Sequence, residues 1–156
     1  MQISELLSEQ YTLVGIPPGD KKSVISNLID VLKGHPSVKD LEAVRTAVHD
    51  REAVMSTGVG NGLAIPHAKT SAVDDTVAVL AVTQGPVEFD AIDGEPVRIL
   101  FLLVGTPESK SSHVRILSRI SRLMNLKRFR EQLLSAETGS DLLSFLSDRE
   151  NQLRES

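Results

Sequence analysis

Two short apolar runs constrain the fold of this 156-residue chain more than any other feature. Val77–Val82 and Ile99–Val104 contain only apolar residues, many of them β-branched. Runs of this length and composition are typical of buried β-strands and are far too short to cross a bilayer. We therefore expect two core strands and no insertion into a membrane. The N-terminus lacks the features of a signal peptide, so we expect a cytoplasmic protein.

Helical patterns surround these strands. Asp20 is a good N-cap for a helix with apolar residues at helical spacing, and Ser37 is predicted to cap the next helix. Tyr11–Val14 and Val87–Asp90 are predicted as further strands, the second at an edge. Helical spacing resumes at Ser111 and continues through three segments. This alternation predicts a single α/β domain.

Composition excludes several classes of protein. The chain has no cysteine, which excludes disulfides, thiolate chemistry and cysteine-based zinc sites. Aromatic residues make up 3% of the chain and the net charge is −4, which argues against a nucleic-acid partner.

The segment 56–67 carries the pattern most indicative of chemistry. Its glycines, Gly58, Gly60 and Gly62, alternate with other residues and precede Pro66-His67. Glycines allow backbone N–H groups to approach an anion closely, and proline holds the histidine in a non-helical segment. These three glycines do not have the Gly-x-Gly-x-x-Gly spacing of a dinucleotide site, because its third glycine is missing. The pattern also lacks the lysine of a Walker loop and the Gly-x-Ser-x-Gly turn of a serine hydrolase. Covalent phosphoryl chemistry on His67 remains, with a plain hairpin turn as the alternative.

Two further residues are candidates for the same site. Arg51 precedes His67 by sixteen residues and has the planar fork that matches phosphate, although an ordinary surface arginine fits equally well. His113 begins a long amphipathic helix, where a neutral ring is favoured, and a solvated histidine is the alternative. A metal site using both histidines and a carboxylate is disfavoured because no paired ligand spacing is present.

The stretch from Arg51 to His67 closely resembles the active-site motif of enzyme IIA domains of the bacterial phosphoenolpyruvate-dependent sugar phosphotransferase system. It is most similar to the fructose/mannitol branch, which includes the nitrogen-regulatory IIA proteins. The segments Val104–Pro107 and Ser112–Leu117 also fall where the family has them. The resemblance covers nearly the whole chain, so residues 1–156 are expected to form one IIA domain of type 2. Met55 and Lys69 are small departures from the family pattern.

The resemblance implies a mixed β-sheet flanked by helices and a phosphotransferase with a phosphohistidine intermediate. It implies that His67 accepts a phosphoryl group on Nε2 from the histidine-containing phosphocarrier protein and passes it to an enzyme IIB. His113 then supports His67, and Arg51 lies near the phosphate. We expect no metal and no cofactor. The residues predicted to bind the phosphate are Thr57, Gly58, Gly60, Asn61 and Gly62.

Two roles stay open within this family. The IIB step of this branch uses a cysteine, which this chain lacks. The chain is therefore expected either to serve sugar uptake with a separate acceptor or to bind regulatory target proteins according to its phosphorylation state. A metal-dependent hydrolase using His67 and His113 is a more distant alternative.

Overall fold

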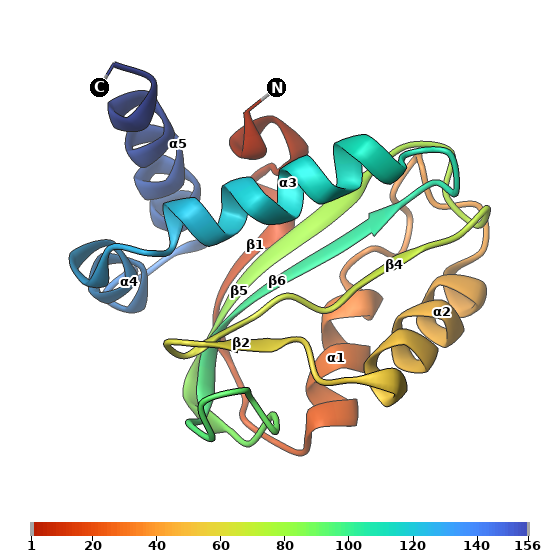
Figure 1. The fold of residues 1–156 in the computed structure, drawn as a ribbon, viewed down its shortest axis with the longest axis horizontal. Coiled ribbons are helices and arrows are strands. Elements are labelled where there is room, and N and C mark those ends of the chain that lie inside the picture. The colour runs from red at the N-terminus through yellow and green to blue at the C-terminus, as the bar shows by residue number, and fades with distance from the viewer. Residues whose placement is uncertain (1, 156) are drawn as a thin grey trace.

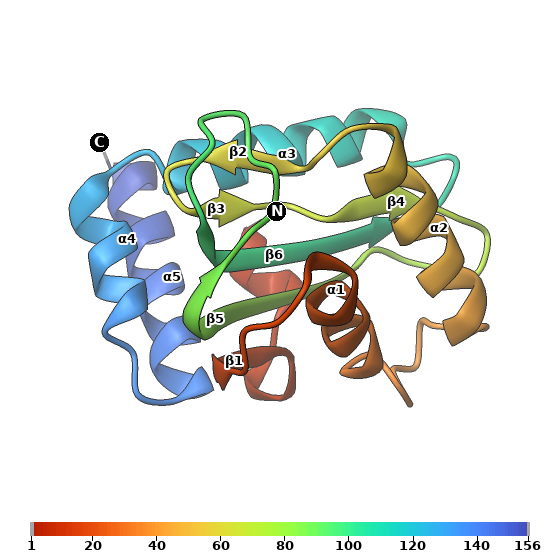
Figure 2. The same cartoon turned by 90° about the horizontal axis from the view of Figure 1, so that it is seen from below.

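A mixed six-stranded β-sheet carries helices on both faces (Figures 1 and 2), which confirms the predicted α/β class. The computed structural model describes residues 2–155. Two short 3₁₀ helices, η1 (Ile3–Leu6) and η2 (Glu9–Tyr11), precede the sheet. The strands are β1 (Thr12–Ile16), β2 (Gly58–Gly60), β3 (Leu63–Ala64), β4 (His67–Lys69), β5 (Val77–Val87) and β6 (Val97–Gly105). The helices are α1 (Lys21–Asp30), α2 (Leu41–Val54), α3 (Lys110–Leu123), α4 (Lys127–Leu134) and α5 (Gly139–Glu155).

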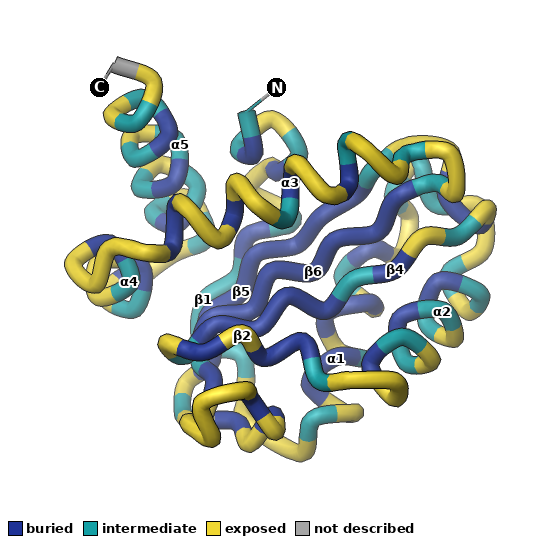
Figure 3. Tube along the Cα trace, viewed as in Figure 1, coloured by how far each residue is buried: buried dark blue, intermediate teal, exposed yellow. Residues whose placement is uncertain are grey.

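The two apolar runs form β5 and β6, which pair antiparallel at the centre of the sheet. Figure 3 shows both strands buried along nearly their whole length. Alternate residues of β5 face opposite layers: Val79 packs with α1 and α2, whereas Leu80 packs with η1 and α3–α5. Each fully buried side chain of this size contributes about 1.5–3 kcal/mol to stability. A strand covered on both faces has no polar face, which explains the unbroken apolar runs.

The start of α1 follows the prediction, but the start of α2 does not. Asp20 caps α1 by accepting the N–H of Ser23 at 2.9 Å. The predicted cap of the next helix, Ser37, is wrong, because Asp40 caps α2 by accepting the N–H of Ala43 at 3.1 Å. The chain between the two helices consists mainly of turns, with Val38 in a β-bridge to Val73. This long-range pairing delays the helix by three residues.

The predicted edge strand at Val87–Asp90 is also wrong. β5 continues to Val87, which pairs with Val97 of β6, and the chain then forms a loop over residues 88–96. Phe89 is fully buried, so the alternation reflects a loop anchored by its aromatic ring rather than a strand. This loop lies against β2, where the N–H of Ile92 donates to the carbonyl of Gly58 at 3.1 Å.

The sheet brings two distant histidines to one end of β6. β4 runs parallel to β6 with His67 opposite Leu103, and the N–H of Leu103 donates to the Pro66 carbonyl at 3.0 Å. β6 ends at Gly105, and α3 begins five residues later and carries His113 in its first turn. Within residues 2–155 no helix combines the length and the apolar character needed to cross a bilayer.

Candidate active site

The ring of His67 is held in one tautomer by the backbone two residues earlier. Its Nδ1 lies 2.6 Å from the carbonyl oxygen of Ile65. A carbonyl can only accept, so Nδ1 carries the proton and donates. In the neutral ring Nε2 then has no proton and its lone pair is available for reaction. Pro66 separates the two residues and fixes the backbone that brings the carbonyl to the ring.

The surroundings of His67 favour the neutral ring. Burial lowers the pKa of His67 below the ordinary value of 6.5, while the hydrogen bond to Ile65 raises it. Arg51 and Lys69 lower the pKa by charge repulsion, and Glu52 raises it by charge attraction. The balance keeps the imidazole neutral, and therefore nucleophilic, near neutral pH.

His113 lies directly beside His67, as the resemblance implied. The two ring centroids are 5.5 Å apart and the rings are tilted by 51°. His113 is only 4% exposed, and neither ring nitrogen has a hydrogen-bond partner among the described residues. Burial, with smaller contributions from His67 and Lys69, lowers the pKa of His113 to about 4. A buried polar group without a partner is costly, so this ring is a candidate for hydrogen bonding to a ligand. The alternative interpretation of His113, a solvated histidine at the start of a helix, is therefore wrong.

Space for the His113 ring depends on Gly105. A Cβ atom added to Gly105 would lie 3.1 Å from Nδ1 of His113 and 2.7 Å from the hydroxyl of Ser109. Position 105 therefore belongs to the wall of the site. The glycine occurs in the Val104–Pro107 segment of the resemblance, but its contact with His113 could not be inferred from the sequence.

The low pKa of His113 predicts a pH-dependent stability. The unfolded chain binds a proton at this ring near pH 6.5, whereas the folded chain does so only near pH 4. Its contribution is thus complete above pH 6.5 and is lost as the pH falls towards 4. We expect the unfolding free energy to fall less steeply over this range in His113→Gln than in the wild type. Urea titrations between pH 7 and 4 measure the unfolding free energy of both proteins. Parallel dependence of this free energy on pH in the two proteins would contradict the prediction.

His67 opens onto a cleft of about 610 Å³, referred to below as the His67 cleft. Its rim is apolar and exposed: Met55, Val59 and Ile92 are 70%, 47% and 85% exposed. Exposed apolar side chains gathered around a reactive group are typical of a protein-binding surface. The lining residues are Arg51, Met55, Ser56, Thr57, Gly58, Val59, Ile65, His67, Asp90, Ile92, Leu117 and Ser121.

Arg51 reaches the same cleft from the last turn of α2. Its Nη1 donates to the carbonyl of Met55 at 2.9 Å. That bond uses one of the five N–H groups of a guanidinium. This contact with the backbone orients the side chain at the cleft.

The structure divides the five residues predicted to bind phosphate. Thr57 and Gly58 line the His67 cleft, whereas the other three form the turn of the β2–β3 hairpin and do not line it. Gly60, Asn61 and Gly62 have φ values of 98°, 59° and 75°, which explains the glycines. The plain hairpin was thus the better interpretation of this turn.

The loop amides do not form the expected anion cradle. The N–H of Thr57 donates to Glu52, that of Gly58 to the Ser56 hydroxyl, and that of Asn61 to Asp93. A donor already engaged inside the protein gains little by turning to a ligand. Phosphate binding by these amides is not supported by this geometry.

Gly58 has a steric role that can be tested. A Cβ atom at this position would lie 2.8 Å from both Cα and Cβ of Ala91, in the 88–96 loop. We expect Gly58→Ala to destabilise the protein by about 1–3 kcal/mol, because neither backbone can move without breaking the contact between β2 and this loop. Gly19→Ala is the matched control, since nothing lies within 4 Å of its added Cβ. Urea unfolding of both variants measures the effect, and equal midpoints would contradict it.

Glu52 is the residue at this site that sequence reasoning missed. It is 7% exposed and accepts both the N–H and the hydroxyl of Thr57, at 2.7 and 2.5 Å. Nζ of Lys21 lies 2.8 Å from its Oε2. An acidic residue adjacent to Arg51 near a helix end gives no signal of burial in the sequence.

The other histidines lie outside the His67 cleft and have structural partners. Nδ1 of His35 accepts the N–H of Ser37, and Nε2 of His49 lies 2.9 Å from the Ser26 hydroxyl. Within residues 2–155 no group of three or more histidine, aspartate or glutamate side chains is placed to hold a metal ion. The metal-dependent alternative therefore has no ligand set in this part of the chain.

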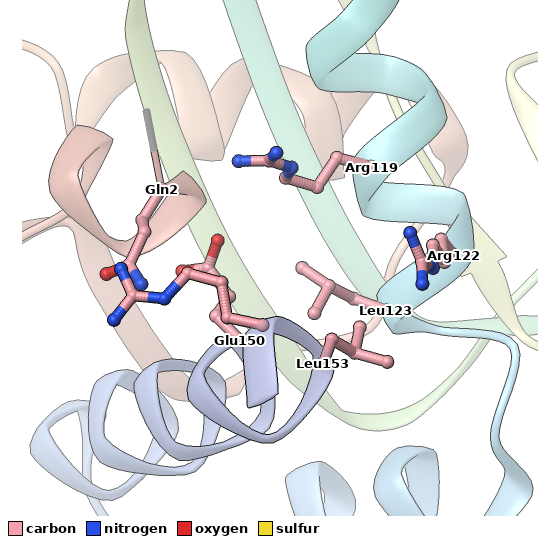
Figure 4. A pocket seen from close by; sticks show the side chains of 7 residues that line it. Gln2, Arg119, Arg122, Leu123, Glu150 and Leu153 are labelled. Atoms are coloured by element: carbon pink, nitrogen blue, oxygen red, sulfur yellow. The ribbon is translucent and has the colours of Figure 1, made fainter. Parts of the chain in front are cut away.

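A second cavity, of about 110 Å³, lies between α3 and α5 (Figure 4). Arg119, Arg122 and Glu150 contribute to its lining. Glu150 is 5% exposed and accepts the N–H groups of Ile3 and Ser4 at 2.6 and 2.8 Å. The Glu150 carboxylate therefore links η1 to α5 by these two hydrogen bonds. The cavity belongs to the packing of the N-terminal segment against α5.

Comparisons with known proteins agree on one family. Residues 5–149 match the family model described as "Phosphoenolpyruvate-dependent sugar phosphotransferase system, EIIA 2". A fructose-specific EIIABC component from Bacillus subtilis is 31% identical over 96% of this chain, which spans 24% of that protein. A nitrogen regulatory protein from Pseudomonas aeruginosa is 30% identical over 97% of this chain and 98% of its own length. The crystal structure of nitrogen regulatory protein IIA-Ntr from Neisseria meningitidis superposes with a TM-score of 0.86 at 28% identity, covering 92% of this chain and 98% of that one.

Proposed function

Because this chain belongs to the EIIA 2 family of the phosphoenolpyruvate-dependent sugar phosphotransferase system, we propose that it carries a phosphoryl group on Nε2 of His67. The observation that carries the proposal is the hydrogen bond from Nδ1 of His67 to the Ile65 carbonyl. It leaves Nε2 as the unprotonated nitrogen of a half-buried ring at the edge of an open cleft.

The transfer exchanges one P–N bond for another. The lone pair of Nε2 attacks the phosphorus of the donor phosphohistidine, which we propose belongs to the histidine-containing phosphocarrier protein. The donor P–N bond breaks as the new one forms, and the donor nitrogen keeps the bonding pair. The proton on Nδ1 stays in its bond to Ile65, so no proton needs to leave the His67 ring.

Arg51 and His113 are the proposed ligands of the transferred group. The guanidinium offers N–H groups in a plane that matches phosphate oxygens. His113, neutral above its pKa of about 4, offers one ring N–H. Phosphoryl transfer depends mainly on positioning and charge stabilisation. His113 is held by burial, and Arg51 by its hydrogen bond to the Met55 carbonyl.

The apolar rim of the His67 cleft is the proposed docking surface for donor and acceptor. In-line transfer requires two proteins to bring their reactive atoms together and to exclude water. Met55, Val59 and Ile92 provide exposed apolar area around His67 for this contact. A phosphate on His67 adds about two negative charges to the centre of this surface, so the two states of the chain present different surfaces to a partner.

The downstream partner is either an enzyme IIB or a regulatory target. The relatives named above include both a fructose-specific component and nitrogen regulatory proteins. The sequence contains no cysteine, so a cysteine-bearing IIB must lie on another segment or another chain. Incubation of the phosphorylated protein with a fructose-type IIB separates the roles: transfer to the IIB cysteine supports uptake, and retention of the label supports regulation.

Phosphorylation in a reconstituted system tests the proposal. The purified chain is incubated with labelled phosphoenolpyruvate, enzyme I and the phosphocarrier protein. We expect one labile phosphate per chain that is lost in acid and retained in base, as a phosphohistidine requires. Absence of label, or an acid-stable phosphate ester, would contradict it.

A further inference from the structure

We propose that Glu52 is a positioning residue that orients Arg51 for the phosphoryl group on His67. This inference rests on the proposed function of His67. Glu52 does not itself line the His67 cleft. It acts through the backbone of the segment that joins α2 to β2, residues 55–57.

The first step is the clamp on Thr57. Both carboxylate oxygens of Glu52 are engaged by this one residue, Oε2 by its N–H and Oε1 by its hydroxyl. A carboxylate that is 7% exposed must be paired to be tolerated, and Lys21 supplies the opposite charge at 2.8 Å. Contacts of a charged group with two donors of one residue fix that residue in both position and orientation.

The second step leads from the clamp to Arg51. The chain leaves α2 at Met55, which has extended backbone angles (φ −164°, ψ 139°). The position of Thr57 therefore determines where the Met55 carbonyl points. That carbonyl is the acceptor for Nη1 of Arg51 at 2.9 Å. If Thr57 is released, the Met55 carbonyl can rotate and Arg51 loses its orienting contact.

The third step concerns the contacts of Ser56, which hold residues 55–57 from the other side but do not orient Arg51. The Ser56 hydroxyl donates to the carbonyl of Phe89 at 2.6 Å and accepts the N–H of Gly58 at 3.1 Å. These contacts hold the segment to the 88–96 loop. They do not involve α2, so the position of residues 55–57 relative to α2 and Arg51 depends on Glu52.

Lys21 contributes a second effect, on charge. Its ammonium group lies 4.9 Å from the centre of the Phe89 ring as well as against Glu52. Lys21 offsets most of the Glu52 charge, and the remainder raises the pKa of His67. Without Lys21, an uncompensated carboxylate would remain near the site of a phosphoryl group that carries the same sign.

Glu52→Gln tests the inference with little change of shape. A carboxylate accepts at both oxygens, whereas an amide accepts at one end only. With its oxygen toward the Thr57 N–H and Lys21, the glutamine NH₂ group faces the Thr57 hydroxyl and can no longer accept from it, and the negative charge opposite Lys21 is lost. We expect phosphate still to appear on His67, with kcat for transfer from the phosphocarrier protein about 10- to 100-fold lower and KM nearly unchanged. Glu42→Gln is the matched control on the same helix: its side chain is 75% exposed and pairs with Arg45, away from the cleft. An unchanged kcat in Glu52→Gln would overturn the inference.

A double-mutant cycle separates positioning from general loss of stability. If Glu52 acts through Arg51, its substitution has no further effect on kcat in an Arg51→Ala background, so the two losses are not additive. Additive losses would overturn the inference and would indicate a purely structural role. The carrier function of His67 and the positioning role of Glu52 can be refuted separately. A wild-type protein without label on His67 refutes the carrier function itself. Label on His67 with equal rates for wild type and Glu52→Gln refutes only the positioning role.

Discussion

Substitution of His67 by alanine is expected to abolish phosphate incorporation completely. No other described side chain combines a free ring nitrogen with a position on the cleft. His113 is nearby, but it is 4% exposed and lies behind His67 in the protein interior. A carrier that loses its nucleophile has no alternative route to a P–N bond, so the effect is all or none rather than a reduced rate.

The control for this experiment is His49→Ala. His49 is also partly buried, its pKa is also lowered, chiefly by burial, and it also has a side-chain partner, the Ser26 hydroxyl. It lies outside the His67 cleft, so we expect full labelling of this variant. Acid-labile label measured by filter binding distinguishes the two. Residual label in His67→Ala at the wild-type level would place the phosphate elsewhere and refute the assignment.

The central part of the fold could be predicted from the sequence because it depends on burial. The runs that became β5 and β6 are apolar at every position from Val77 to Val82 and from Ile99 to Val104, and only strands covered on both faces need this. The loops could not be predicted in the same way. Phe89 resembles part of a strand until the structure shows that its ring anchors a loop against β2 and α1.

The rigid placement of His67 could also be predicted, but its surroundings could not. Pro66-His67 after a glycine-rich turn indicated a rigid imidazole, and the family resemblance implied a role for His113. Glycine spacing shows where the backbone can adopt unusual angles, but it does not show where the N–H groups point. Their acceptors include Asp93, 32 residues from Asn61. For the same reason Glu52 was missed: its partner Lys21 comes from a different helix.

Substitution of His113 by alanine is expected to leave labelling of His67 detectable but to slow onward transfer by about 100-fold. The His113 ring lies beside that of His67, with the centroids 5.5 Å apart, and its nitrogens have no partner among the described residues. Its loss removes a hydrogen bond to the phosphoryl oxygens. Because the transition state carries the same oxygens, between two nitrogens when the group arrives and between a nitrogen and the IIB sulfur when it leaves, the rates of both steps depend on this proposed bond.

The neutrality of His113 is essential to this prediction. A carrier must release its phosphoryl group as readily as it accepts it, so strong stabilisation of the phosphorylated state alone would slow the next step. A permanent positive charge inside the protein would do that, whereas a neutral N–H donor contributes a weaker bond. Burial keeps the pKa of His113 near 4 and so keeps the ring neutral at working pH.

His113→Gln and His113→Lys distinguish these effects. Glutamine keeps an uncharged N–H donor, so we expect it to recover part of the onward rate that alanine loses. Lysine introduces a cation that the neutral His113 ring does not provide, and we expect this variant to retain label on His67 while transferring it onward more slowly than the glutamine variant. Single-turnover transfer to an enzyme IIB measures all three variants. Equal onward rates for wild type and His113→Ala would show that His113 has no part in the transfer.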